Sequence, residues 1–90
     1  MGAQVKRRRV KFQIHADANS KVSVAGTFNG WNPSKHVLKS KDGAYALNVL
    51  LEPGQYQYKF VVNDIWCVDP EREDWAPNDF GSLNSVITVS

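Results

Sequence analysis

Hydrophobic residues alternate with polar residues along most of this chain, so the hydrophobic pattern has a period of two. Near the start, Val10, Phe12 and Ile14 alternate with Lys11 and Gln13. Successive side chains of a β-strand point to opposite faces, so this spacing is typical of a strand with one buried face. No segment keeps the i, i+3, i+4, i+7 spacing of an amphipathic helix over three turns. The chain is therefore predicted to be all-β.

Turn-forming residues divide the pattern into short segments. Gly30 and Pro33 lie in a predicted loop, residues 41–43 form a predicted turn, and Pro53-Gly54 ends a strand. Residues 69–82 are expected to be a loop. The expected strands are residues 10–16, 21–28, 36–39, 45–49, 56–62, 65–68 and 83–89. About seven short strands separated by turns are typical of an immunoglobulin-like β-sandwich.

One predicted hairpin determines which side chains share a face. A two-residue turn at Asn63-Asp64 would pair Val61 with Trp66. Lys59 and Trp66 would then lie on the outward face as diagonal neighbours, about 7–8 Å apart between their backbones. The opposite, core-facing set is expected to be Tyr58, Phe60, Val62, Ile65 and Cys67. An indole beside an ammonium group on an outward face suggests a binding surface.

Length and charge set the domain organisation. The 90 residues suffice for one domain and are too few for two. We expect a basic, flexible N-terminal arm over residues 1–7 and one sandwich domain over residues 8–90. Beyond residue 11 lie six of the eleven basic residues and all nine acidic ones, a net charge of −3. A neutral ligand therefore suits the body of the domain better than a strongly anionic one.

The basic residues from Lys6 to Lys11 leave a second hypothesis open. They could contact nucleic acid or another polyanion. They could equally form a frayed terminus and a charged edge strand that resists pairing with other sheets. The second interpretation is favoured because the rest of the chain is net acidic, so a nucleic-acid partner is not expected.

The expected compartment is the cytoplasm. Cys67 is the single cysteine, so an internal disulfide is impossible. The N-terminus lacks the apolar core of a secretory signal, and no apolar run approaches the roughly 20 residues of a membrane span.

Catalytic constellations are not expected. The two histidines, His15 and His36, are predicted to be surface residues, and Cys67 to be an inert thiol in the core. A glycosidase needs two carboxylates on opposite sides of a cleft. The carboxylates of residues 69–79 lie on one predicted loop and have no opposing partner. No glycine-rich phosphate loop precedes a helix. We therefore expect no enzyme activity, no cofactor and no metal site.

Aromatic residues carry the functional prediction. Trp31 lies in a Gly/Asn/Pro loop and Trp66 faces outward by the pairing argument, so both are expected to be exposed. Exposed indoles suggest a binding platform. The C–H face of a glucose ring is apolar and stacks on an aromatic face, while its hydroxyls need polar partners. Lys59, Ser82 and Asn84 could supply them.

Residues 24–33, VAGTFNGWNP, and residues 54–62, GQYQYKFVV, are two recognisable motifs. They resemble the G-x-F-N-x-W segment and the G-x-x-x-Y-K-F-x-V strand of carbohydrate-binding module family 48. Trp66, Asp69-Pro70 and Asn84 follow in the family's order. The resemblance covers about residues 8–90 and implies an immunoglobulin-like, early-set β-sandwich closest to the glycogen-binding domain of the AMP-activated protein kinase β subunit.

The resemblance also implies a site. Its two tryptophans stack on glucose rings, its lysine and asparagine bond sugar hydroxyls, and an apolar leucine enters the ligand ring. The corresponding residues here are Trp31, Lys59, Trp66, Phe80, Ser82 and Asn84. Residues 75–82 depart from the family pattern: the loop is one residue longer, Phe80 replaces leucine, and Trp75 is added.

The sequence therefore predicts a non-catalytic module that binds α-1,4-linked glucan, such as glycogen, starch, maltooligosaccharide or β-cyclodextrin. Its expected partner is this α-glucan, with a kinase or amylolytic catalytic chain as a further candidate and no membrane. The alternative is a protein-interaction or structural module of a larger kinase or amylolytic enzyme, without sugar binding of its own.

Overall fold

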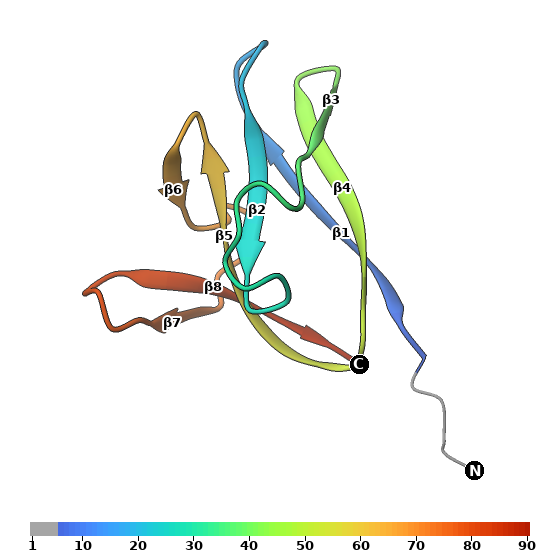
Figure 1. Ribbon diagram of the computed structural model, residues 1–90, viewed down its shortest axis with the longest axis vertical. Coiled ribbons are helices and arrows are strands. Elements are labelled where there is room, and N and C mark those ends of the chain that lie inside the picture. Colours follow the sequence, from blue (N-terminus) through green and yellow to red (C-terminus); the bar gives the residue numbers. More distant parts are fainter. Residues whose placement is uncertain (1–5) are drawn as a thin grey trace.

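The computed structural model describes residues 6–90 as two antiparallel β-sheets packed into a sandwich (Figure 1). The three-stranded sheet has the order β1-β4-β3, and the five-stranded sheet has the order β2-β5-β8-β7 with β6 also paired to β5. The strands are β1 (Arg8–His15), β2 (Val22–Gly26), β3 (Lys39–Lys41), β4 (Ala44–Leu51), β5 (Gly54–Val62), β6 (Ile65–Cys67), β7 (Trp75–Pro77) and β8 (Leu83–Val89). The predicted all-β, immunoglobulin-like sandwich is confirmed. Most of the arm expected over residues 1–7 lies outside the described residues.

The core lies between the inward faces of the two sheets. Val10, Phe12 and Ile14 of β1 are buried there, as their alternation predicted. Phe12 meets Tyr58 of β5 edge to face with 4.9 Å between ring centroids, and Tyr58 meets Phe60 in the same way. Both β5 rings are fully buried. Such pairs contribute stability beyond the buried area alone.

Pairing at the β3–β4 hairpin differs from the prediction. The strand expected at residues 36–39 is displaced, because β3 begins only at Lys39. Asp42 and Gly43 both have positive φ and form a two-residue turn, so Lys41 pairs directly with Ala44. Just before Lys39, an isolated bridge pairs Val37 with Ser23 of β2.

The expected loop over residues 69–82 contains a strand. β7 pairs with β8, with Trp75 opposite Ser85 and Pro77 opposite Leu83. Proline is tolerated at Pro77 because β7 is at the edge of its sheet and needs hydrogen bonds on one side only. Prediction of a loop throughout this segment was wrong.

The β5–β6 hairpin forms with the predicted register. Val61 pairs with Trp66, and the turn residues Asn63 and Asp64 both have positive φ. Ile65 was expected in the core but is 69% exposed. Its strand β6 is short and pairs only with β5 among the described strands. Cys67 packs against the core, and burial raises the pKa of its thiol, as suits an inert residue.

No helix within residues 6–90 could cross a membrane.

Candidate functional site

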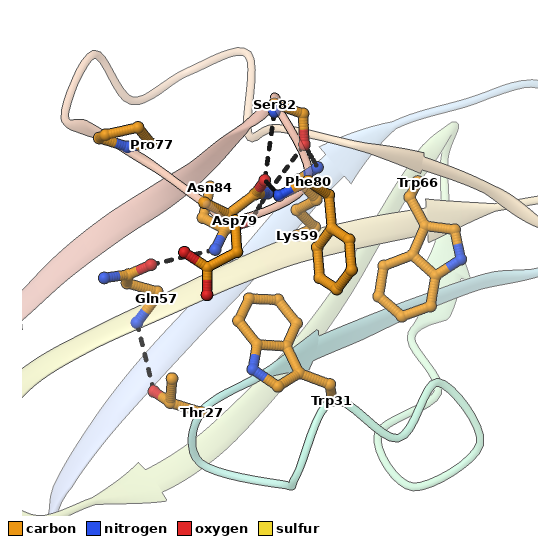
Figure 2. A pocket seen from close by; sticks show the side chains of 11 residues that line it. Thr27, Trp31, Gln57, Lys59, Trp66, Pro77, Asp79, Phe80, Ser82 and Asn84 are labelled. Carbon is orange, nitrogen blue, oxygen red and sulfur yellow. Dashed lines mark hydrogen bonds between the residues drawn. The ribbon is translucent and has the colours of Figure 1, made fainter.

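An open cleft of about 600 Å³ lies on the outer face of the five-stranded sheet (Figure 2). Three segments far apart in the sequence form it: the loop after β2, the β5–β6 hairpin and the β7–β8 hairpin. All six residues singled out in the sequence line this cleft: Trp31, Lys59, Trp66, Phe80, Ser82 and Asn84. The structure therefore places these residues together on one face of the molecule.

A tight turn after β2 presents Trp31. Gly26 ends β2 where a Cβ atom would lie 2.5 Å from the carbonyl oxygen of Gln57, so only glycine fits. The side chain of Asn29 accepts a hydrogen bond from the Gly26 N–H at 3.0 Å and donates one to the Val24 carbonyl at 3.0 Å. The N–H of Trp31 donates to the Gly26 carbonyl at 2.9 Å. These bonds fix the half-buried indole at the rim of the cleft.

His36 supports this turn and is not the surface residue that the sequence suggested. Its Nδ1 lies 2.9 Å from the Asn29 Nδ2, and its ring meets Phe28 edge to face. Since Asn29 Nδ2 is a donor, Nδ1 must accept and the ring must be neutral. Burial lowers the pKa of His36 from its ordinary value of 6.5, and the nearby Lys35 lowers it further. His15, by contrast, is exposed as expected.

Acid is expected to weaken the Trp31 side of the cleft. The folded chain lowers the pKa of His36 and therefore favours its neutral ring. This contribution to folding stability is fully present above pH 6.5 and is lost as the pH falls through the lowered pKa. Protonated Nδ1 can no longer accept the hydrogen bond from Asn29, and the loss of this bond costs about 1 kcal/mol. For a ligand that needs this turn, the affinity should fall roughly fivefold. Titration of maltoheptaose between pH 7.5 and 5 should show this decline, and His36→Gln should flatten it. An equal decline in both proteins would contradict the role of His36.

Trp66 and Lys59 come from the β5–β6 hairpin. Trp66 is 43% exposed, on the face opposite the buried Tyr58 and Phe60. Lys59 lies on the same outward face and donates from Nζ to Ser82 Oγ at 3.0 Å. The bond ties the ammonium group to the β7–β8 hairpin, which leaves two of its three N–H donors for a ligand.

Asn84 forms the polar floor of the cleft. It is 6% exposed, and its Nδ2 donates to Gln57 Oε1 at 3.0 Å. Its Oδ1 accepts from Asn78 Nδ2 at 3.1 Å. Both amide groups of Asn84 are thus oriented by neighbours, and each keeps one further hydrogen-bonding position.

Asn78 is a residue of the site that sequence reasoning missed. Its Oδ1 accepts from the backbone N–H groups of Phe80 at 2.9 Å and Ser82 at 3.1 Å, and its Nδ2 also donates to Ser82 Oγ at 2.8 Å. One side chain therefore holds the whole loop between β7 and β8. An asparagine ahead of a glycine-containing turn, here Asn78 before Gly81, was the available signal. Other lining residues that were missed are Thr27, Gln57, Pro77 and Asp79.

This loop carries the most exposed aromatic ring. Phe80 is 93% exposed, and in Figure 2 its ring lies between those of Trp31 and Trp66. Exposure of a phenyl ring is unfavourable in water, so its position at the cleft suits contact with an apolar surface. Asp79 is the one carboxylate among the residues that line the cleft. A pair of carboxylates facing each other, as glycoside hydrolysis needs, is therefore not formed by this lining.

Two neighbouring residues lie outside the cleft. Trp75 is 51% exposed and pairs with Ser85, so it points to the face of β7–β8 opposite Asn84. Asp69 was expected on a solvated loop but is 3% exposed. It accepts a hydrogen bond from the buried Tyr58 hydroxyl at 2.7 Å and forms an ion pair with Arg72. Its role is to anchor the chain between β6 and β7.

Comparison with known proteins agrees with this description. A family profile described as the glycogen recognition site of AMP-activated protein kinase matches residues 9–90. The protein FLOURY ENDOSPERM 6, chloroplastic, of Oryza sativa subsp. japonica is 33% identical over 82 residues, covering 91% of this chain and 15% of that protein. PTST homolog 2, chloroplastic, of Arabidopsis thaliana is 40% identical over 77 residues, covering 86% and 14%. The β-2 subunit of 5'-AMP-activated protein kinase of Homo sapiens is 32% identical over 74 residues, covering 82% and 26%.

A solved structure shows the same fold. The maltogenic amylase from S. marinus matches with a TM-score of 0.79 and 19% identity, over 100% of this chain and 15% of that one. The chain thus corresponds to a small part of each of these proteins.

The β-sandwich fold and the family profile together identify the chain as a carbohydrate-binding module. This chain belongs to the family of glycogen-recognition modules of AMP-activated protein kinase.

Proposed function

We propose that this module binds α-1,4-linked glucan without catalysis, by stacking glucose rings on Trp31 and Trp66. The observation that carries the proposal is the position of both indoles on one open cleft, with Phe80 between them. The apolar C–H faces of glucose suit these rings. A curved glucan presents successive sugar faces at an angle, so two rings on separate walls of a cleft suit it better than a single flat platform.

Polar groups of the cleft suit a neutral, hydroxyl-rich ligand. Lys59 offers free N–H donors beside Ser82, and Asn84 offers one donor and one acceptor on the floor. These groups would bond sugar hydroxyls at the edges of the stacked rings. Phe80 would contact the apolar inner surface of the curved chain. Since the cleft is open, we expect a single-site dissociation constant of about 1 μM to 1 mM.

The names of the relatives suggest partners and a location, and these remain proposals. The module corresponds to only a part of the kinase subunits and of the amylase. It could therefore bring a kinase or amylolytic catalytic chain to its glucan. The rice and Arabidopsis relatives carry chloroplastic in their names, so the cytoplasmic location expected from the sequence stays a prediction.

Titration of the chain with maltoheptaose and β-cyclodextrin tests the proposed function. Tryptophan fluorescence should change saturably, and an amylose-containing native gel should retard the protein. β-1,4-linked glucose oligosaccharides of the same length serve as the control and should leave the tryptophan emission unchanged. Flat emission with the α-glucans and unretarded migration would overturn the proposal and favour a protein-interaction module.

A further inference from the structure

A second chemically distinct face lies on the other side of the sandwich. The three-stranded sheet turns Val10, Phe12 and Ile14 of β1 to the core, so the alternate residues of its strands point outward. In Figure 1, β1, β4 and β3 lie side by side, away from β6 and β7. The proposed glucan cleft is on the outer face of the other sheet, so this outer face remains free when the cleft is occupied.

The register shows that this outward face is basic. Arg9 pairs with Leu50 and Lys11 with Asn48 on one side of β4. Lys39 pairs with Ala46 and Lys41 with Ala44 on the other side. The four cationic side chains flank a central strand whose outward residues are neutral: Ala44, Ala46, Asn48 and Leu50. We call this surface, with its four cations and the neutral residues between them, the basic face.

The strands of this sheet hold no acidic residue, although Asp69 and Glu71 of the chain after β6 line a shallow pocket together with Lys11. Within residues 6–90 the ion pairs include none from these four cations, which are all exposed. By contrast, the five-stranded sheet has one cation, Lys59, in its strands. A chain with a net charge of only +2 has therefore gathered its cations on one sheet, which favours an acidic partner.

The dimensions of the basic face suit one helix. Strands β1 and β3 are two strand spacings apart, about 9.6 Å, which is close to the 10–12 Å diameter of an α-helix with its side chains. The small side chains of Ala44 and Ala46 leave room above β4. From Ala44 to Leu50 the strand extends about 20 Å, the length of about 14 helical residues. A helix lying along β4 would meet Arg9 and Lys11 on one flank, and Lys39 and Lys41 on the other.

We propose that the basic face docks an acidic α-helix of a protein partner, about four turns long, with small or apolar residues toward Ala44, Ala46 and Leu50. Other anionic occupants fit the face less well. A single-stranded nucleic acid needs several aromatic stacking platforms, and the outward residues of this sheet include one aromatic ring, the imidazole of His15. Insertion at a membrane surface needs a row of apolar or aromatic side chains, and Leu50 is the one large apolar residue there.

A labelled synthetic peptide of about 18 residues tests the proposal, with alanine along one stripe of the helix and glutamate on both flanks. Fluorescence polarisation at low ionic strength should show saturable binding to the whole chain. Lys39→Glu with Lys41→Glu, or Arg9→Glu with Lys11→Glu, should each weaken it at least about tenfold. The milder pair Lys39→Gln and Lys41→Gln should weaken peptide binding by a smaller factor. If thermal unfolding shows that the charge-reversed variants do not fold, the glutamine variant provides the test.

Matched controls separate the face from net charge. Lys21→Glu with Lys35→Glu changes the charge equally at exposed positions away from the sheet and should change affinity twofold or less, within about 0.4 kcal/mol. The same peptide with glutamine in place of glutamate should not bind, and saturating maltoheptaose should not compete. Equal losses in both pairs of variants, or no peptide binding by the wild-type chain, would overturn the proposal. Binding of duplex RNA or phosphatidylserine vesicles through these cations, without peptide binding, would overturn it in favour of those ligands.

Discussion

Trp66→Ala is expected to weaken binding of maltoheptaose by about 30-fold or more. An aromatic anchor at the centre of a binding surface contributes about 2 kcal/mol or more on truncation, and each 1.4 kcal/mol is about tenfold in affinity. Trp31→Ala should have a similar effect, because both indoles line the same cleft. The double variant should show no measurable binding by calorimetry and no retardation in an amylose gel.

The third tryptophan provides the matched control. Trp75 is as exposed as a binding residue would be, yet the β7–β8 register turns it away from the cleft. Trp75→Ala should therefore leave the dissociation constant within about twofold of the wild-type value. If Trp75→Ala reduced the affinity as much as Trp66→Ala, or if both cleft variants bound normally, the proposed site would be wrong.

Asp69→Ala should be the most destabilising of the polar substitutions, by about 2–3 kcal/mol. It would leave the fully buried Tyr58 hydroxyl without its acceptor, and Arg72 without its ion-pair partner. It would also remove the oxygen that accepts from the Glu71 N–H at 2.9 Å. A domain of this size has a free energy of unfolding of roughly 5–10 kcal/mol, so the shift in a urea titration should be large.

A double-mutant cycle identifies the bond responsible. Tyr58→Phe removes the hydroxyl that Asp69 accepts from, so the cost of Asp69→Ala should be smaller in that background by about 1 kcal/mol or more. Strict additivity of the two substitutions would show that Asp69 acts through the Glu71 N–H and Arg72 and not through Tyr58. Because the network lies in the core, the cleft variants at Trp31 and Trp66 should not couple to it.

Local spacing was enough to predict most of the strands. The alternation around Phe12 and Tyr58 gave the correct inward faces, because burial on one face imposes a period of two. Asn63-Asp64 gave the hairpin register that brings Trp66 beside Lys59, since this dipeptide tolerates positive φ at both turn positions. The family motifs then pointed to the six residues that the structure gathers at one cleft.

What the sequence could not provide depends on contacts between distant segments. β7 is only three residues long and contains a proline, so its pairing with β8 leaves no periodic signal. Burial of Asp69 depends on a hydroxyl eleven residues earlier in the chain. Exposure of Ile65 follows from the position of β6, which pairs with β5 alone among the described strands, and no local pattern reports this. Asn78 had a recognisable turn signal, but its bond to Asn84 follows only from the folded hairpin.

The open form of the cleft affects how the module would respond to polymer length. An open cleft on the outer face of a sheet can admit the middle of a glucan chain as well as its end. Every run of consecutive glucoses on a long polymer is then a possible binding position. Apparent affinity per polymer molecule should then rise in proportion to the number of such placements, while the contact at each of them is unchanged. A released module would find an equivalent placement nearby, which allows it to move along the polysaccharide surface.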